Sequence, residues 1–122
     1  MIDTEGLTGA ETLLRVLSHM GVDRIFSSPG SEWSPVWEAF AKAKAQSEGV
    51  PLYISSRHEE VAVGMASGYA KSTGKLPAVM IHTTVGALHA TMALRGVRGR
   101  LLHGKLRVLK PGTSRRAASK QE

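Results

Sequence analysis

Hydrophobic and polar positions in the first 97 residues predict helices that alternate with short strands. Segments with apolar residues on one helical face indicate amphipathic helices, whereas short apolar runs bounded by Gly, Pro or Ser indicate strands. In chain order, the predicted elements are a helix over 8–20, a strand over 22–26, a turn over 27–31, a helix over 34–46, a strand over 51–55, a helix over 59–72, a strand over 78–81 and a helix over 86–95. Beyond Gly96 the alternation stops.

Local signals mark the ends of several of these elements. Thr8 and Glu11 have the spacing of a capping box, and Gly21 stands where a helix-ending glycine is expected. Ser34 is a candidate N-cap, and Pro35 then occupies the first helical position. The sequence therefore delimits the first helix at both ends and the second at its start.

Strands that are separated by helices are typical of α/β proteins with a parallel sheet. The third strand is mostly apolar, as expected when helices cover both faces of the sheet. We therefore predict an α/β fold, a three-layer sandwich with a parallel sheet. Residues 1–97 are expected to form this domain, and residues 98–122 a separate tail.

The positive charge of the chain lies almost entirely in its last 25 residues. The net charge is +6, but residues 1–97 carry eight Lys or Arg against nine Asp or Glu, whereas residues 98–122 carry eight against one. We interpret residues 98–122 as a mostly disordered basic tail. Such a tail supports one alternative function, a non-catalytic binder of anions or nucleic acid. Residues 1–97 contain no nucleic-acid motif, so no specific nucleic-acid partner is expected.

Composition argues against several other classes of protein. The sequence has no cysteine, which excludes disulfides, a thiol nucleophile and cysteine metal sites. The acidic segment 1–5 does not resemble a signal peptide, and no run approaches the ~18 apolar residues of a membrane span. We expect a cytoplasmic protein without a membrane partner.

Polar residues follow each predicted strand, where parallel α/β sheets bind their ligands. Because the strands are predicted to be parallel, these loops should meet at one edge of the sheet. The loops are 30–31, 57–60 and 82–84. No metal site is expected, because no metal-ligand spacing relates the histidines His58, His82, His89 and His103.

Three stretches, in order and spacing, resemble the N-terminal, pyrimidine-binding domain of thiamine diphosphate enzymes, the superfamily of acetolactate synthase and benzoylformate decarboxylase. They are residues 21–30, 57–62 (RHEEVA) and 68–75 (GYAKSTGK). The resemblance runs from about Thr8 to Gly96. At Gly30-Ser31 and Ile81-His82 the chain looks closer to the benzoylformate decarboxylase branch.

The resemblance implies thiamine diphosphate as cofactor and a role for Glu59. In this family the glutamate at this position hydrogen-bonds N1′ of the aminopyrimidine and promotes formation of the cofactor ylide. Beside an aromatic base in an apolar cleft, its carboxyl pKa is expected to be raised. From the residues alone, the alternative is that Glu59 stabilises a helix N-terminus through the helix dipole, as we expect of Glu60.

Further site residues follow from the same resemblance. His82 would handle protons on the substrate, as a catalytic and substrate-binding residue, and Ser31 would contact the substrate carboxylate. The alternatives are a histidine bonded to local backbone and a serine that caps a helix. The remaining expected cofactor-binding residues are Pro29, Gly30, Thr83 and Gly86. Two positions depart from the family pattern, which often has Asp at Ser67 and Asn at His89.

The resemblance also implies an incomplete thiamine diphosphate-binding fold, since the family sheet has six strands and this sequence predicts three. In the family, Mg²⁺ and the diphosphate are held by a separate domain with a Gly-Asp-Gly signature, which this sequence lacks. The expected partners are a pyrophosphate-binding domain or partner subunit, and a homo-oligomer when complete. The chain is thus expected to be a truncated part of a 2-oxo acid decarboxylase or carboligase, inactive alone. The alternative is the small subunit of a split decarboxylase.

Overall fold

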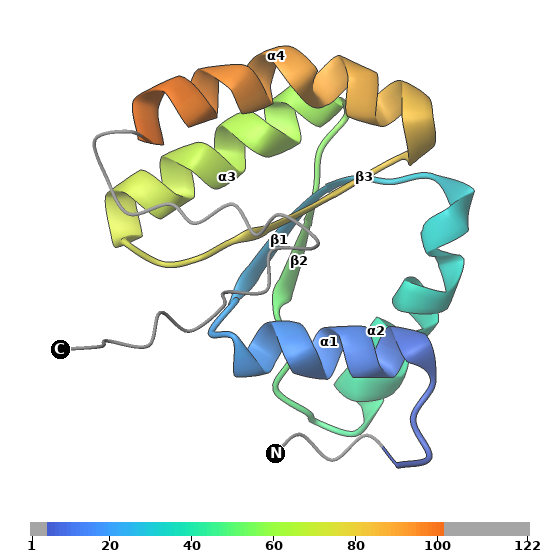
Figure 1. Ribbon diagram of the computed structural model, residues 1–122. Helices are drawn as coiled ribbons and strands as arrows, with labels where there is room; N and C mark the ends of the chain where they lie inside the picture. The colour runs from blue at the N-terminus through green and yellow to red at the C-terminus, as the bar shows by residue number, and fades with distance from the viewer. Residues whose placement is uncertain (1–4, 102–122) are drawn as a thin grey trace, which may run out of the picture.

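The computed structural model describes residues 5–101, and it forms three layers around a small sheet (Figure 1). Two helices, α1 and α2, pack on one face of the sheet, and α3 and α4 lie over the other face. The elements are α1 Gly9–His19, β1 Arg24–Ser28, the 3-10 helix η1 Ser31–Trp33, α2 Ser34–Ala45, β2 Leu52–Ser55, α3 Glu59–Thr73, β3 Ala78–Ile81 and α4 Thr83–Leu101. The predicted α/β sandwich with an incomplete parallel sheet is confirmed.

The three strands of the sheet are parallel and lie in the order β2-β1-β3. Phe26 in the central strand is opposite Ile54 of β2 and Val79 of β3. Because β1 lies in the middle, the chain crosses over it between β2 and β3, and all three strands end at the same edge.

The alternation of side chains along β1 gives each face of the sheet its own core. Ile25 is fully buried and packs with Leu14 of α1 and Val36 of α2. Phe26 points to the other face and packs with Ala62 and Ala66 of α3. The helix residues of both cores lie on the apolar helix faces that the sequence pattern predicts.

The helix ends also follow the sequence signals in most places. The capping box at Thr8 is formed in both directions, with 3.3 Å from the Glu11 N–H to the Thr8 hydroxyl and 2.7 Å for the reverse bond. Gly21 follows α1 with a positive φ of 80°, and Gly74 ends α3 with a φ of 70°. Both are backbone conformations that glycine adopts without strain.

The first strand begins two residues later than predicted and includes Ser27 and Ser28. The N–H of Val22 bonds to the carbonyl of Leu17 at 3.0 Å, so this residue still closes α1. Ser28 instead pairs with Ile81 of β3, which extends β1 into the predicted turn.

Two helix starts differ from the sequence prediction. Ser34 is the first residue of α2 rather than its cap, because η1 precedes it and the Ser34 hydroxyl donates to the Ser31 carbonyl at 2.7 Å. Helix α4 starts at Thr83, whose N–H bonds to Glu32 at 3.2 Å, so a distant loop supplies the cap.

Helix α4 also continues past the predicted boundary at residue 97 and runs to Leu101. A glycine such as Gly96 weakens a helix by about 1 kcal/mol without ending it. The rest of the predicted basic tail, from residue 102, lies outside the described residues.

Candidate functional site

The candidate site lies where β1 and β3 end side by side. After β1 the chain turns to η1 and α2 on one face, whereas after β3 it turns to α4 on the other face. Parallel α/β sheets bind ligands at this kind of position, where neighbouring strands lead to opposite faces of the sheet. The first turn of α3, after β2, reaches the same edge.

Glu59 is the first residue of α3, and its side chain is only 11% exposed. The residue before it, His58, is the N-cap of the helix, and its Nδ1 accepts the Glu60 N–H at 3.3 Å. Burial of the carboxylate distinguishes Glu59 from Glu60, which is exposed as a helix-start charge would be.

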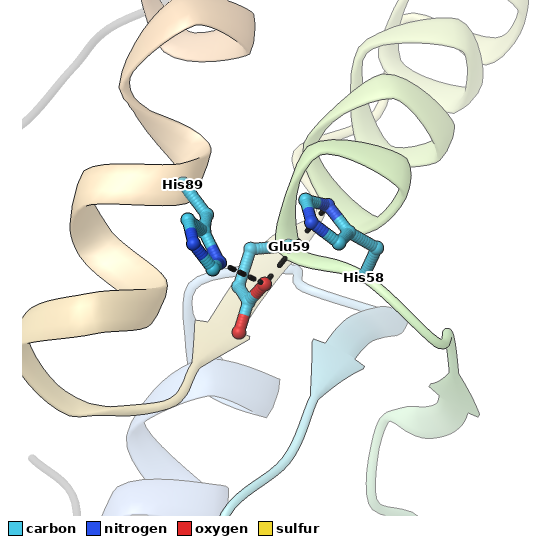
Figure 2. Close-up of side chains that lie close together, drawn as sticks. All are labelled: His58, Glu59 and His89. Atoms are coloured by element: carbon cyan, nitrogen blue, oxygen red, sulfur yellow. Dashed lines mark ion pairs between the residues drawn. The ribbon is translucent and has the colours of Figure 1, made fainter.

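Two histidines face the buried carboxylate (Figure 2). Nδ1 of His89, from α4, lies 3.5 Å from Oε2 of Glu59, and Nδ1 of His58 lies 4.0 Å from the same oxygen. The two imidazole rings are stacked at 5.2 Å with an angle of 16°. Residues 30 positions apart in the sequence thus form one cluster, which we call the histidine–glutamate cluster.

Gly86 of α4 leaves room for the other oxygen of this carboxylate. A Cβ at position 86 would lie 2.8 Å from Oε1 of Glu59 and 3.2 Å from its Cγ. This separation is shorter than real Cβ contacts, so position 86 requires glycine while Glu59 keeps its place. Glu59 and Gly86, two of the expected cofactor-binding residues, therefore lie in contact.

The pKa of Glu59 is lowered in the protein alone, and the raised pKa expected beside an aromatic base stays a prediction. The N–H of its own backbone is the largest cause, and burial acts in the raising direction. Hydrogen bonds from His89 and Ser28 and the nearby His58 add to the lowering. Polar neighbours therefore outweigh desolvation, and the carboxylate is ionised at neutral pH.

His82 follows β3 directly and is held by Glu32, a residue that the sequence analysis missed. Nδ1 of His82 lies 2.7 Å and 2.8 Å from the two oxygens of Glu32. Gly30 lies against this pair, since a Cβ there would come within 1.9 Å of the imidazole. His82 is therefore oriented by a side chain rather than by local backbone.

The pKa of Glu32 is lowered as well. Desolvation raises the pKa of Glu32. The hydrogen bonds from His82 and from the backbone N–H groups of Glu32 and Thr83 together lower it by more. One signal could have identified Glu32 in the sequence. It directly follows residues 30–31, the loop that was expected at this edge of the sheet.

The other predicted residues lie at the same edge with fewer contacts. Ser31 is exposed and is not a helix cap, since Gly30 and Trp33 occupy the cap positions of η1 and α2. Thr83 is exposed at the start of α4, and Pro29 is half-buried between β1 and Gly30. Trp33, also unforeseen, fixes the loop to β3 because its indole N–H donates to the Ile81 carbonyl at 3.1 Å.

Comparison with known proteins identifies this architecture. The family described as thiamine pyrophosphate enzyme, N-terminal TPP binding domain, matches residues 7–99. The chain belongs to this family. It is 37% identical to the acetolactate synthase large subunit of Buchnera aphidicola subsp. Schizaphis graminum. The 86 aligned residues are 70% of this chain and 14% of the relative.

Other relatives in the thiamine pyrophosphate enzyme family give the same picture. Acetolactate synthase of Mycobacterium avium is 36% identical over 93 residues, which are 76% of this chain and 14% of the relative. The acetolactate synthase isozyme 3 large subunit of Escherichia coli K12 is 34% identical over 86 residues, which are 70% of this chain and 14% of the relative. The matched segment thus spans about a seventh of these relatives. These relatives are acetolactate synthases. They therefore do not support the expectation that the chain is more similar to the benzoylformate decarboxylase branch.

The residues at this edge fit the aminopyrimidine of thiamine diphosphate. Both histidine contacts involve Oε2 of Glu59, and Gly86 provides the space beside Oε1. An ionised carboxylate at this edge can form a charge-assisted hydrogen bond with a flat aromatic base that carries a hydrogen-bonding nitrogen. Within residues 5–101, no helix is long and apolar enough to span a membrane.

Proposed function

We propose that this chain supplies the pyrimidine-binding half of the active site of a thiamine diphosphate enzyme that acts on 2-oxo acids, as a decarboxylase or carboligase. The observation that carries the proposal is the buried carboxylate of Glu59, with Gly86 opposite its Oε1. The membership in the thiamine pyrophosphate enzyme family supports the choice of cofactor.

When bound, thiamine diphosphate supplies a nucleophilic carbon and an electron sink for the substrate. Glu59 then serves as the hydrogen-bond partner of N1′ of the aminopyrimidine and shares a proton with it. The lowered pKa keeps Glu59 anionic before the cofactor arrives. Covering the carboxylate with an aromatic ring removes water from it and raises the pKa towards the range in which it can carry that proton.

His82 and Ser31 act on the substrate in this proposal. Oε1 of Glu32 lies 2.7 Å from Nδ1 of His82 and orients the ring, and His82 exchanges protons with the substrate. Ser31, exposed in the neighbouring loop, offers a hydroxyl to the substrate carboxylate. Pro29 follows β1 and Thr83 begins α4 at the same edge of the sheet, and both contact the cofactor in this proposal.

The diphosphate and its Mg²⁺ are proposed to lie on a partner, a pyrophosphate-binding domain or subunit within a homo-oligomeric enzyme. The outer face of α4 supports the need for a partner. Val85, Leu88 and Met92, at one-face helical spacing, are 58%, 68% and 65% exposed. An apolar helix face of this kind is typical of an interaction surface.

Thiamine without its phosphates tests the proposal, because it carries the aminopyrimidine but gives the basic residues 98–122 no anion to bind. We expect saturation-transfer NMR to detect weak binding through the pyrimidine protons. Glu59→Ala should remove the signal, whereas Glu60→Ala, the matched control one residue away, should retain it. Equal signals from the two variants would refute the role of Glu59.

A further inference from the structure

We infer that His58, Glu59 and His89 form a binding site for a divalent transition-metal ion of the zinc class. The three side chains each offer one ligand atom, and these atoms lie within 4.8 Å of one another. Two of the residues come from the start of α3 and the third from α4, so the folded chain alone creates the cluster (Figure 2).

The spacing of the ligand atoms suits one shared ion. Zn–N and Zn–O bonds of ~2.0–2.1 Å in a tetrahedral site place neighbouring ligand atoms about 3.3 Å apart. In the structure the two imidazole Nδ1 atoms lie 3.5 Å and 4.0 Å from Oε2 of Glu59. Small side-chain rotations therefore bring all three atoms to bonding distance of a single ion.

The donor set determines the kind of metal. Two imidazoles and a carboxylate match the zinc sites of hydrolytic enzymes and the iron sites with two histidines and one carboxylate. Mg²⁺ and Ca²⁺ prefer oxygen ligands and are disfavoured by imidazole. The site is thus distinct in chemistry from the Mg²⁺ that accompanies a diphosphate.

Exposure and support of the ligands are also suitable. The side chains of His58 and His89 are 48% and 52% exposed, so an ion can enter and keep a water as its fourth ligand. Glu59 is held from behind by its backbone N–H and by Ser28. Such second-layer contacts orient metal ligands and raise their affinity.

The geometry favours a metal site over simple hydrogen bonding of Glu59. One imidazole would satisfy Oε2, yet two stacked rings converge on it through Nδ1. The ion would replace the weak 3.3 Å bond from the Glu60 N–H to His58 and the direct contacts of the two imidazoles with Oε2. The ion would bind Oε2 of Glu59, the residue that the proposed function assigns to the aminopyrimidine, so metal binding is measured without thiamine.

Titration of the full chain with Co²⁺ at pH 7.5 tests the site, because Co²⁺ reports coordination through its visible absorption. We expect one Co²⁺ per chain, displaced by Zn²⁺ and not by Mg²⁺. His89→Asn and His58→Asn should each weaken binding at least about tenfold, as a lost ligand costs more than a lost second-layer contact. Asn is a good N-cap, so the variant at position 58 retains the start of α3.

His82→Asn is the matched control, since it removes an imidazole from a histidine–carboxylate pair that has only two members. It should leave Co²⁺ affinity unchanged. On the unmodified chain, Zn²⁺ should shift the NMR signals of His58 and His89 among the five histidines. Absence of binding at millimolar Co²⁺, unaltered affinity in the His58→Asn, His89→Asn double variant, or shifts confined to other histidines would overturn the inference.

Discussion

At the scale of single residues, the environment of Glu59 is set by what surrounds each of its two oxygens. Oε2 faces two imidazoles, whereas Oε1 faces a glycine. The polar contacts lower the pKa of the carboxyl in spite of its burial. A lowered pKa in the folded state means that ionised Glu59 stabilises the fold above its ordinary pKa, and that this contribution is lost as the pH falls through the lowered value.

Gly86→Ala should displace the Glu59 carboxylate without unfolding α4. A Cβ at this position would lie 2.8 Å from Oε1, and alanine favours helix more than glycine does. We expect the variant to fold and to lose thiamine binding as Glu59→Ala does, measured by saturation-transfer NMR.

Gly96→Ala provides the control in the same helix, because a Cβ there meets no atom within 4 Å. Its expected effect is a gain of about 1 kcal/mol in the free energy of unfolding, with thiamine binding unchanged. Normal thiamine binding by Gly86→Ala would show that the space beside Oε1 is not used.

At the scale of elements, Glu11 joins two helices by two different interactions. It completes the capping box at the start of α1 and forms an ion pair with Lys42 of α2. Hydrogen bonds from Lys42 first, and then from Thr8, lower the pKa of Glu11 from 4.5 to about 2. The α1–α2 pair therefore depends on an ionised Glu11.

Glu11→Gln should destabilise the protein at neutral pH, and the difference from the unmodified chain should shrink in acid. The folded pKa lies below the unfolded pKa, so the stabilisation is complete above about pH 4.5 and disappears as the pH falls to about 2. Urea unfolding at several pH values measures this difference. Glu38→Gln, on the exposed side of α2, is the matched control, and at neutral pH its free energy of unfolding should stay close to that of the unmodified chain.

At the scale of the whole molecule, the described residues leave large apolar side chains exposed on the sheet and on α4. Leu52 of β2 and Val79 of β3 are 55% and 37% exposed in the two outer strands of the sheet. The matched segment corresponds to 14% of the length of its acetolactate synthase relatives. The proposed activity therefore needs groups that this sequence does not contain.

We expect the purified 122-residue chain to show no turnover of pyruvate or benzoylformate with thiamine diphosphate and Mg²⁺. No Gly-Asp-Gly segment is present to hold the ion and the diphosphate. Detection of released CO₂ in a coupled assay measures this, with the Glu59→Ala variant as a control for contaminating enzymes. Turnover that Glu59→Ala abolishes would contradict the requirement for a partner.

The existence and order of the helices and strands were predictable from the amino-acid pattern. Capping residues, helix-ending glycines and apolar periodicity act within a few positions, so α1, α3 and the parallel strands were predictable. The motif around Glu59 likewise placed it at the functional edge. These features depend on local interactions, which a linear pattern records.

Only the tertiary structure decided which side chains meet at that edge. Glu32 reaches His82 and caps α4 across 50 residues of sequence, and His89 reaches Glu59 from a helix whose start was predicted three residues too late. His89 also adds to the lowering of the Glu59 pKa, whose largest cause is the residue's own backbone N–H. Such contacts arise from the packing of α3 and α4 over one face of the sheet, and no short-range pattern in the sequence encodes them.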